Sequence, residues 1–164
     1  QLSIGDALAI STLNQKKISK KDFRKFHPSG NLGAKLRTVE EIMITGNKIP
    51  FVNNNLIMKK ALQIISNKKL GILVVRNSKG ITIGVITDGQ IRRFNEVNDN
   101  LQSLTVKEVM TLNPISIDKD TLVEKALSIM NSKKITSLCV HSKKNLKRTV
   151  GILHIHKILE TNIN

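Results

Sequence analysis

The residues best suited to chemistry lie in one short stretch, Gly84 to Arg93. The apolar run Ile81–Ile86 predicts a buried strand that stops at Thr87, and a helical pattern starts at once with Gln90. The Thr87 hydroxyl can cap the free N–H groups at the start of that helix. A hydroxyl and free N–H groups that meet at one point also suit the binding of an anion such as phosphate. Capping alone is the simpler interpretation.

The same pattern occurs a second time near the end of the chain. Gly151 begins another short apolar run, which is followed by His154 and by a helix start that carries Lys157. Gly84 and Gly151 are 67 residues apart, and segment 106–110 repeats segment 39–43 at the same offset. The sequence therefore indicates an internal duplication.

Each copy contains an amphipathic helix and buried strands. Strand patterns over 71–75 and 136–140 follow the helices, and capping-box patterns at Thr38–Glu41 and Thr105–Glu108 open the two copies. A single copy is too small to bury an adequate core by itself. We therefore predict a mixed α+β fold, in which two β-α-β-β-α repeats pack face to face with pseudo-two-fold symmetry and are preceded by helices. The helical positions expected to face the core are Ile57, Ala61, Ile64 and Ile65 in the first copy and Leu122, Ala126, Ile129 and Met130 in the second.

The composition is that of a globular and strongly basic chain. Of its 164 residues, 40% are hydrophobic, and the formal net charge is +15. This charge would suit a polyanion such as nucleic acid. Only 2% of the residues are aromatic, however, and the lysines are scattered in pairs along the chain. We therefore expect solvated lysines and no nucleic-acid partner.

The remaining composition limits the class of protein further. Cys139 is the only cysteine and lies in an apolar strand pattern, so we expect a buried core thiol and no intrachain disulfide. A reducing compartment is compatible with this, and we expect a cytoplasmic protein. No apolar run approaches the length of a membrane span, so no membrane partner is expected. We also predict no metal and no cofactor.

Residues 1–37 precede the first copy. They predict a first helix with one apolar face and a second short helix around Phe23 and Phe26, followed by a turn-rich loop that begins at His27. The chain starts at Gln1 rather than Met, so we expect it to be part of a longer protein. The apolar positions of the first helix are Ile4, Ala7, Leu8, Ile10 and Leu13.

The repeats over 38–164 resemble a pair of CBS domains, the regulatory module named after cystathionine β-synthase. Such pairs bind nucleotides in clefts near the strand–helix junctions, through a Gly-x-x-Thr-x-x-Asp motif whose Thr contacts phosphate and whose Asp contacts ribose. In this sequence Gln90 replaces the first Asp, and His154 and Lys157 replace the second Thr and Asp. The resemblance therefore implies a ligand other than an ordinary adenosine nucleotide, and a lysine suits an anionic group of that ligand.

The whole chain resembles the arabinose-5-phosphate isomerases of the Kdo and capsule pathways, which join a sugar isomerase (SIS) domain to a CBS pair. The resemblance rests on Gly5–Ala9, on the loop His27–Gly33 and on Ile86–Gly89. It implies that His27 assists ring opening or proton transfer in the parent enzyme, a role that suits imidazole.

The same resemblance divides the chain into three parts. Residues 1–37 would be the last helices of the SIS domain, and the two CBS repeats would occupy 38–100 and 101–164. The sugar-phosphate loop and the other catalytic groups would lie before Gln1. We therefore expect no isomerase activity from this chain alone. The parent would interconvert D-ribulose 5-phosphate and D-arabinose 5-phosphate for lipopolysaccharide or capsule synthesis.

Two functional hypotheses follow. In the first, the module binds a nucleotide or nucleotide-sugar, such as CMP-Kdo, as a feedback signal. In the second, it is a structural oligomerisation module with empty clefts, as the loss of both motif aspartates suggests. Either module would act in a homo-oligomer, as a dimer of CBS pairs within a tetrameric parent. The residues predicted to bind a ligand, all at or beside the two strand–helix junctions, are Thr87, Arg92, Thr136, His154 and Lys157.

Overall fold

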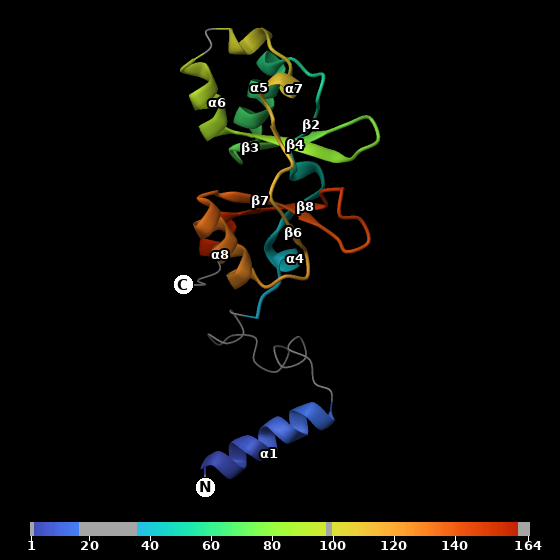
Figure 1. The fold of residues 1–164 in the computed structure, drawn as a ribbon, viewed down its shortest axis with the longest axis vertical. Helices are drawn as coiled ribbons and strands as arrows, with labels where there is room; N and C mark the ends of the chain where they lie inside the picture. The colour runs from blue at the N-terminus through green and yellow to red at the C-terminus, as the bar shows by residue number, and fades with distance from the viewer. Residues whose placement is uncertain (1, 17–35, 98–99, 161–164) are drawn as a thin grey trace.

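The structure is a computed structural model that describes residues 2–16, 36–97 and 100–160. Two four-stranded sheets lie one above the other, each with helices on its outer face (Figure 1). The first copy forms α4 (Val39–Ile42), β1 (Ile44–Thr45), the 3-10 turn η1 (Gly46–Lys48), β2 (Phe51–Asn53), α5 (Met58–Lys68), β3 (Ile72–Arg76), β4 (Thr82–Thr87) and α6 (Asp88–Asn95). The second forms η2 (Leu101–Ser103), α7 (Val106–Val109), β5 (Thr111–Leu112), β6 (Ser116–Asp118), α8 (Val123–Lys133), β7 (Ser137–His141), β8 (Gly151–His154) and α9 (Ile155–Leu159).

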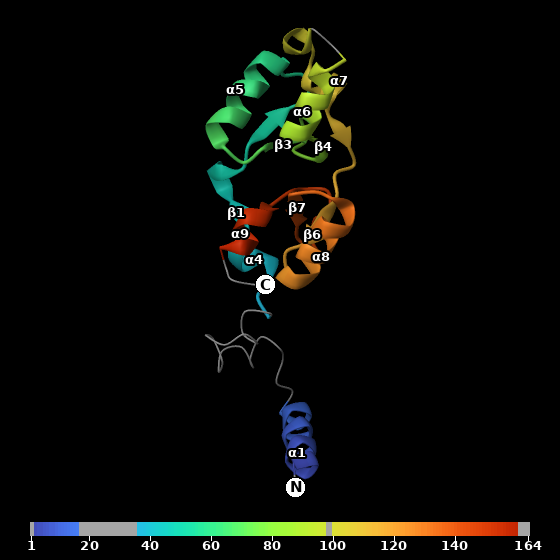
Figure 2. The ribbon, with the colours of Figure 1, turned by 90° about the vertical axis from the view of Figure 1, so that its left-hand side faces the viewer.

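The two copies exchange their first strands. Strand β1 pairs antiparallel with β8 of the second copy, and β5 pairs antiparallel with β4 of the first, so that the sheet orders are β1-β8-β7-β6 and β2-β3-β4-β5. Figure 2 shows α4 in the same half as α8 and α9, although α4 belongs to the first copy. Each packing unit therefore combines segments from both sides of residue 100.

Strands β3 and β7 are each buried on both faces. Successive side chains of a strand point to opposite faces, so one set packs on the helices of its own layer and the other set packs in the seam between the two sheets. In β3, Leu73 and Val75 pack against the helices of their own layer, while Ile72 and Val74 point into the seam between the sheets. Cys139 of β7 lies in this seam cluster as well. Because the cluster joins residues of both copies, the predicted face-to-face packing is confirmed.

The two outer cores use equivalent positions. Ala61 and Ala126 are fully buried, and Ile65 and Met130 are 5% and 1% exposed. Ile57 differs from the sequence prediction, since it is 49% exposed. It is the N-cap of α5 and lies before the first helical residue, and Met58 takes the buried position instead.

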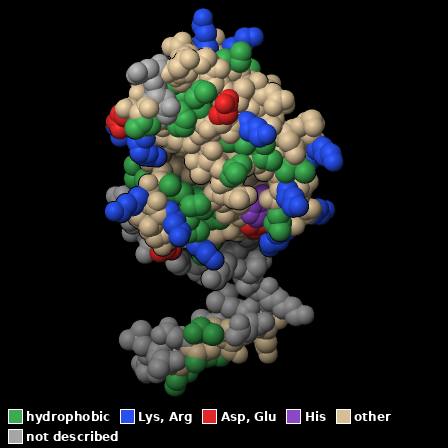
Figure 3. All heavy atoms as spheres, turned by 45° about the horizontal axis from the view of Figure 1, so that its top comes forward, with side chains coloured by type: hydrophobic (Ala, Val, Ile, Leu, Met, Phe, Trp, Pro, Cys, Tyr) green, Lys and Arg blue, Asp and Glu red, His purple; other side chains and the backbone are tan. Residues whose placement is uncertain are grey.

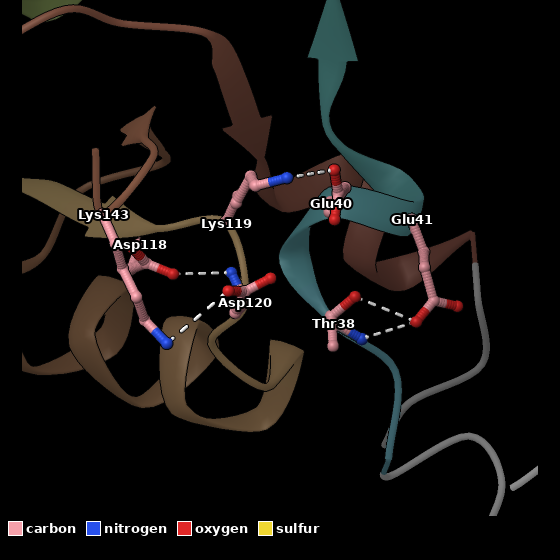
Figure 4. Close-up of polar contacts among 7 residues, drawn as sticks. All are labelled: Thr38, Glu40, Glu41, Asp118, Lys119, Asp120 and Lys143. Atoms are coloured by element: carbon pink, nitrogen blue, oxygen red, sulfur yellow. Dashed lines mark hydrogen bonds and ion pairs between the residues drawn. The ribbon is translucent and has the colours of Figure 1, made fainter. Parts of the chain in front are cut away.

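Both predicted capping boxes are confirmed. The Glu41 Oε1 atom accepts hydrogen bonds from Thr38 N–H at 3.0 Å and from the Thr38 hydroxyl at 2.9 Å (Figure 4). Glu108 accepts from Thr105 N–H and hydroxyl at 2.7 and 2.6 Å. These bonds fix the start of the short helices α4 and α7, each of which packs against the core of the opposite copy.

A salt bridge and backbone bonds hold the exchanged helix α4 in place. The Lys119 ammonium group lies 2.6 Å from Glu40 Oε1 (Figure 4). Glu40 N–H donates a hydrogen bond to the Lys119 carbonyl at 2.9 Å. Val39 N–H donates to the Thr121 carbonyl at 2.8 Å, and the Val39 side chain is fully buried. The backbone bonds and the buried valine contribute more than the salt bridge, because both charged side chains are partly exposed.

The predicted N-terminal helix is present as α1 (Leu2–Gln15). Its side chains Ile4, Leu8 and Ile10 are 67%, 63% and 59% exposed among the described residues. The second predicted helix, around Phe23 and Phe26, lies outside the described residues.

Two glycines leave room for the exchanged strands to lie close to their partner strands in the opposite copy. A Cβ atom at Gly84 would lie 2.8 Å from Met110 Sδ and 2.9 Å from the Thr111 carbonyl oxygen. A Cβ atom at Gly151 would lie 3.0 Å from Met43 Cγ and 3.2 Å from the Ile44 carbonyl oxygen. Both motif glycines thus have a packing role at the crossing of the exchanged strand.

We predict that Gly84→Ala lowers the free energy of unfolding by roughly 1–3 kcal/mol, because the added methyl group displaces backbone as well as a methionine side chain. Urea denaturation followed by circular dichroism measures this change. Gly89→Ala is the matched control, since its Cβ would meet only the end of the Arg93 side chain at 3.6 Å and the site is helical. Equal losses in the two variants would contradict the role given to strand exchange.

Candidate functional site

The seam opens at one end into a cavity of about 690 Å3, which we call the seam cleft. Its walls include the strand–helix junctions of both copies, β4–α6 and β8–α9. The loop after β5 forms another wall, so the strand exchange itself helps to build this space. The lining residues are Lys69–Ile72, Val85, Thr87–Gln90, Arg93, Thr111, Asn113–Ile115, Lys134–Ser137, Cys139, His154 and His156.

Thr87 caps helix α6 and also lines the seam cleft. Its Oγ1 atom accepts a hydrogen bond from Gln90 N–H at 3.3 Å, so the predicted capping role is confirmed. A hydroxyl that accepts in this way keeps its own proton as a donor. The same side chain can therefore donate a hydrogen bond to an anionic group in the cleft.

His154 occupies the equivalent position in the second copy. Its Nδ1 atom accepts a hydrogen bond from His156 N–H at 3.2 Å, and the two imidazole rings lie 4.9 Å apart. Burial, and to a lesser extent the neighbouring His156, lowers the pKa of His154 below its ordinary value of 6.5. A neutral ring whose Nδ1 accepts carries its proton on Nε2, so His154 has a hydrogen-bond donor left for a ligand.

The seam cleft has more cationic than anionic lining residues. Lys69, Arg93 and Lys134 line it, and Asp88 is the one carboxylate among its described lining residues. Lys69 and Lys134 are the C-caps of α5 and α8, and both adopt a left-handed backbone, with φ of 54° and 53°. This left-handed conformation is unfavourable for lysine and is usually adopted by glycine or asparagine. The two strained positions lie at equivalent sites beside one cavity.

The predicted ligand residues divide between several places. Thr87, Thr136 and His154 line the seam cleft together. Arg92 does not line it and instead borders another pocket, of about 450 Å3, beside Leu62. His27 lies outside the described residues.

Sequence reasoning missed the three cations of the seam cleft. In the sequence, Lys69 and Lys134 belong to two of the scattered lysine pairs, and only their equivalent positions in the two copies distinguish them. The sequence prediction names Arg92 and not its neighbour Arg93. The helical spacing decides between these two arginines, because successive residues on a helix point about 100° apart.

Gln90, which replaces the motif aspartate, uses its side chain for a hydrogen bond within the fold. Its side-chain amide donates a hydrogen bond to the carbonyl oxygen of Val109 in the exchanged helix α7. The amide therefore stabilises the contact between the two copies. It offers a ligand no negative charge to pair with ribose hydroxyl groups.

Lys157 lies in a second, smaller cavity of about 470 Å3, which we call the lysine cleft. It borders the other exchanged strand, β1, and it shares Leu70 with the seam cleft. The Lys157 ammonium group lies 2.6 Å from the Glu160 carboxylate. The lining residues are Ile42–Thr45, Lys48, Asn67, Lys68, Leu70 and Lys157.

Polar contacts between the copies close the seam at the end of β3 away from the seam cleft. The Arg76 guanidinium group lies 3.0 Å from the centre of the Phe51 ring and donates to the Thr149 carbonyl at 2.7 Å. The Thr82 hydroxyl donates to Thr149 Oγ1 at 2.8 Å. Burial lowers the pKa of Arg76, and Arg148 adds to this effect. These contacts join the two β-hairpins and leave the cleft as the open end.

Cys139 is buried, and burial raises its pKa to about 11, so the thiol is protonated and unreactive at neutral pH. The described residues contain no cluster of three or more His, Cys, Asp or Glu side chains that could hold a metal ion. None of the described helices has both the length and the apolar character that crossing a bilayer requires.

The lysine and arginine side chains are spread over the face of the molecule that Figure 3 displays. Figure 3 shows them at many separate points of the face that it displays, without one dense block. This agrees with the interpretation of the high net charge as a scattered set of solvated lysines.

Comparison with protein families matches both copies to one domain. The model described as CBS domain matches residues 39–96 and 106–163. The CBS-domain pair of protein MJ0100, solved in complex with 5'-methylthioadenosine and S-adenosyl-L-methionine, has a TM-score of 0.67 at 22% identity, over 76% of this chain and 94% of that chain. CBSX2 from Arabidopsis thaliana, solved in complex with AMP, has a TM-score of 0.64 at 20% identity, over 75% of this chain and 93% of that chain.

Similar curated proteins extend the match to nearly the whole chain. Arabinose 5-phosphate isomerase KdsD of Francisella tularensis is 40% identical over 160 residues, which is 97% of this chain and 48% of that protein. Arabinose 5-phosphate isomerase KpsF of Escherichia coli is 35% identical over 155 residues, which is 94% of this chain and 46% of that protein. The chain thus spans about half the length of these relatives.

We predict that His154 makes the stability of the fold depend on pH. Because its pKa is lowered in the folded state, the unfolded chain binds more protons near and below pH 6.5, and stability is lost as the pH falls through this range. The free energy of unfolding from urea titrations should therefore rise between about pH 5 and 7. His154→Asn, which retains an N-cap acceptor, should show a smaller rise. The same rise in both proteins would contradict the assignment.

Proposed function

The chain belongs to the CBS-domain family, and from this premise we propose that it is a regulatory module whose seam cleft binds a nucleotide or nucleotide-sugar. The observation that carries the proposal is the cleft itself, in which Thr87, Thr136 and His154 of two separate copies line one cavity. The complexes of MJ0100 and CBSX2 with adenosine-containing ligands support a ligand of this class.

The lining of the cleft favours an acidic ligand. Lys69, Arg93 and Lys134 can neutralise phosphate or carboxylate groups, while hydroxyl and imidazole donors can orient them. The amide of Gln90 is bonded to Val109 and provides no carboxylate for a ribose. A sugar nucleotide with an acidic sugar, such as CMP-Kdo, matches this lining better than a neutral adenosine derivative.

We further propose that the parent protein is an arabinose-5-phosphate isomerase. The similarity to KdsD and KpsF supports this activity, which interconverts D-ribulose 5-phosphate and D-arabinose 5-phosphate in lipopolysaccharide or capsule synthesis. Binding of a late product to the module would then regulate an early step. In this proposal residues 1–37 form the last part of the SIS domain, and His27 acts in the parent's active site. This chain alone turns over no sugar phosphate. The parent is a cytoplasmic homo-oligomer.

One observation favours a second candidate function. Gln90 donates to Val109 of the exchanged helix, and Lys157 is paired with Glu160, so the two positions of the motif aspartates serve contacts within the fold. In this alternative the module only holds subunits together, and its clefts stay empty.

Isothermal titration calorimetry with CMP-Kdo, AMP and ATP tests the two candidates. We expect heat of binding with CMP-Kdo, and about tenfold weaker binding in Arg93→Gln, which loses a charged contact to the ligand. Arg92→Gln is the matched control, because it removes the same charge one residue away without touching the seam cleft.

The outcomes separate the hypotheses. Binding that weakens in Arg93→Gln and not in Arg92→Gln supports a sensor. Equal weakening in both variants would indicate attraction by net charge alone and would count against the cleft as the binding site. No heat with any of the three nucleotides, together with unchanged subunit assembly, would leave the structural module as the function.

A further inference from the structure

We propose that the turns of the two β-hairpins, β3–β4 and β7–β8, form a surface that attaches the protein to an anionic phospholipid bilayer. Both turns project from the same edge of the molecule, away from α6 and α8 (Figure 1). This edge lies at the end of the seam that is opposite the seam cleft. We call the surface the basic tip, and it consists of Lys79, Lys143, Lys144, Leu146, Lys147 and Arg148.

The duplication supplies an internal comparison for this surface. The first copy joins β3 to β4 through the short turn 77–81, in which Asn77 Oδ1 accepts two backbone hydrogen bonds at 3.0 Å. The second copy joins β7 to β8 through the longer connection 142–150, and four of the six residues from Lys143 to Arg148 are cations. The flanking strands pair antiparallel in both copies, so the short turn is sufficient for the fold. The longer basic turn therefore points to a function of its own.

Hydrogen bonds between the copies hold the cations of the basic tip close together. Thr82 N–H donates to the Lys147 carbonyl at 2.9 Å, and the Arg148 guanidinium group donates to the Lys79 carbonyl at 2.9 Å. These cations repel one another, and Arg148 accordingly contributes to the lowered pKa of Arg76. A partner with negative charge would offset this repulsion.

The charge of the basic tip is only slightly neutralised within the fold. The Lys143 ammonium group lies 3.6 Å from the Asp120 carboxylate, and the two side chains are 75% and 38% exposed (Figure 4). An exposed pair of this kind is weak and is screened by salt. Residues 143–148 are all exposed, so their side chains are accessible to a large anionic surface.

Leu146 favours a lipid surface over other anionic partners. Its side chain is 65% exposed, and it lies in the sequence between the pair Lys143–Lys144 and the pair Lys147–Arg148. An apolar side chain at such a tip can enter the boundary between headgroups and acyl chains, while the flanking cations contact lipid phosphates. Nucleic acid would instead use aromatic stacking, and only 2% of this chain is aromatic.

Surface attachment of this kind requires no membrane span. The expectation that the chain has no membrane partner rests on the absence of a long apolar run, whereas the basic tip needs only clustered charge and an exposed apolar side chain. The net charge of +15 adds long-range attraction to anionic lipid. Because the seam cleft lies at the opposite edge, it stays open to its own ligand, and the two proposals can fail independently.

Co-sedimentation of the complete chain with phospholipid vesicles tests the proposal. We expect reversible, salt-sensitive binding to vesicles of phosphatidylglycerol mixed with phosphatidylcholine, and none to phosphatidylcholine alone. The double variant Lys144→Gln/Lys147→Gln should weaken binding about tenfold, because it removes two cations from the contact. Leu146→Ser keeps every charge and should weaken binding about fivefold, because it removes the apolar side chain that enters the bilayer.

Lys59→Gln/Lys60→Gln is the matched control, because it removes the same charge from two exposed lysines at the start of α5. Losses in the two basic-tip variants, with little change in this control, support the proposal. Equal losses in both double variants, with no effect of Leu146→Ser, would indicate attraction by net charge alone and would overturn it. Absence of binding to the anionic vesicles would also overturn it. Equally strong binding to poly-glutamate or DNA, unaffected by Leu146→Ser, would overturn it in favour of an acidic macromolecule.

Discussion

The crossing of the first strand of each copy into the sheet of the other is the constraint on which the rest of this structure depends. A two-residue strand contributes few hydrogen bonds, so the exchange is held by packing and caps around it. Val39 and Val106 are fully buried in the core of the opposite copy, and Gly84 and Gly151 leave room for the crossing backbone. Neither copy has a complete core alone, so the pair is the folding unit.

Function follows from the same crossing. The exchanged strands and their loops form one wall of each cleft, while the strand–helix junctions form the other. The cavities are therefore properties of the pair. The duplicated backbone carries unequal side chains, since Thr87 is matched by His154 and Gln90 by Lys157. The clefts on the two sides of the seam thereby differ in chemistry.

Periodicity predicted the elements well, because burial is strongly patterned in this chain. The alternation in β3 and the spacing of Ala61 and Ile65 predicted which side chains face the cores, and the two capping boxes predicted where helices begin. The same patterns gave no partner for any strand. Pairing of β1 with β8 depends on contacts between residues more than 100 positions apart, and a local pattern holds no information on these.

The sequence by itself determined the duplication, the α+β composition of each copy and the glycines, hydroxyl groups and imidazole at the junctions. These features are local, since they depend on residue type and spacing along a few turns of chain. Only the tertiary structure decided which cations share a cavity, and it placed Arg93 rather than Arg92 at the seam cleft and Lys157 in a cleft of its own. The reason is geometric: one residue along a helix changes the direction of a side chain by about 100°, and strand exchange assigns neighbouring segments to opposite layers.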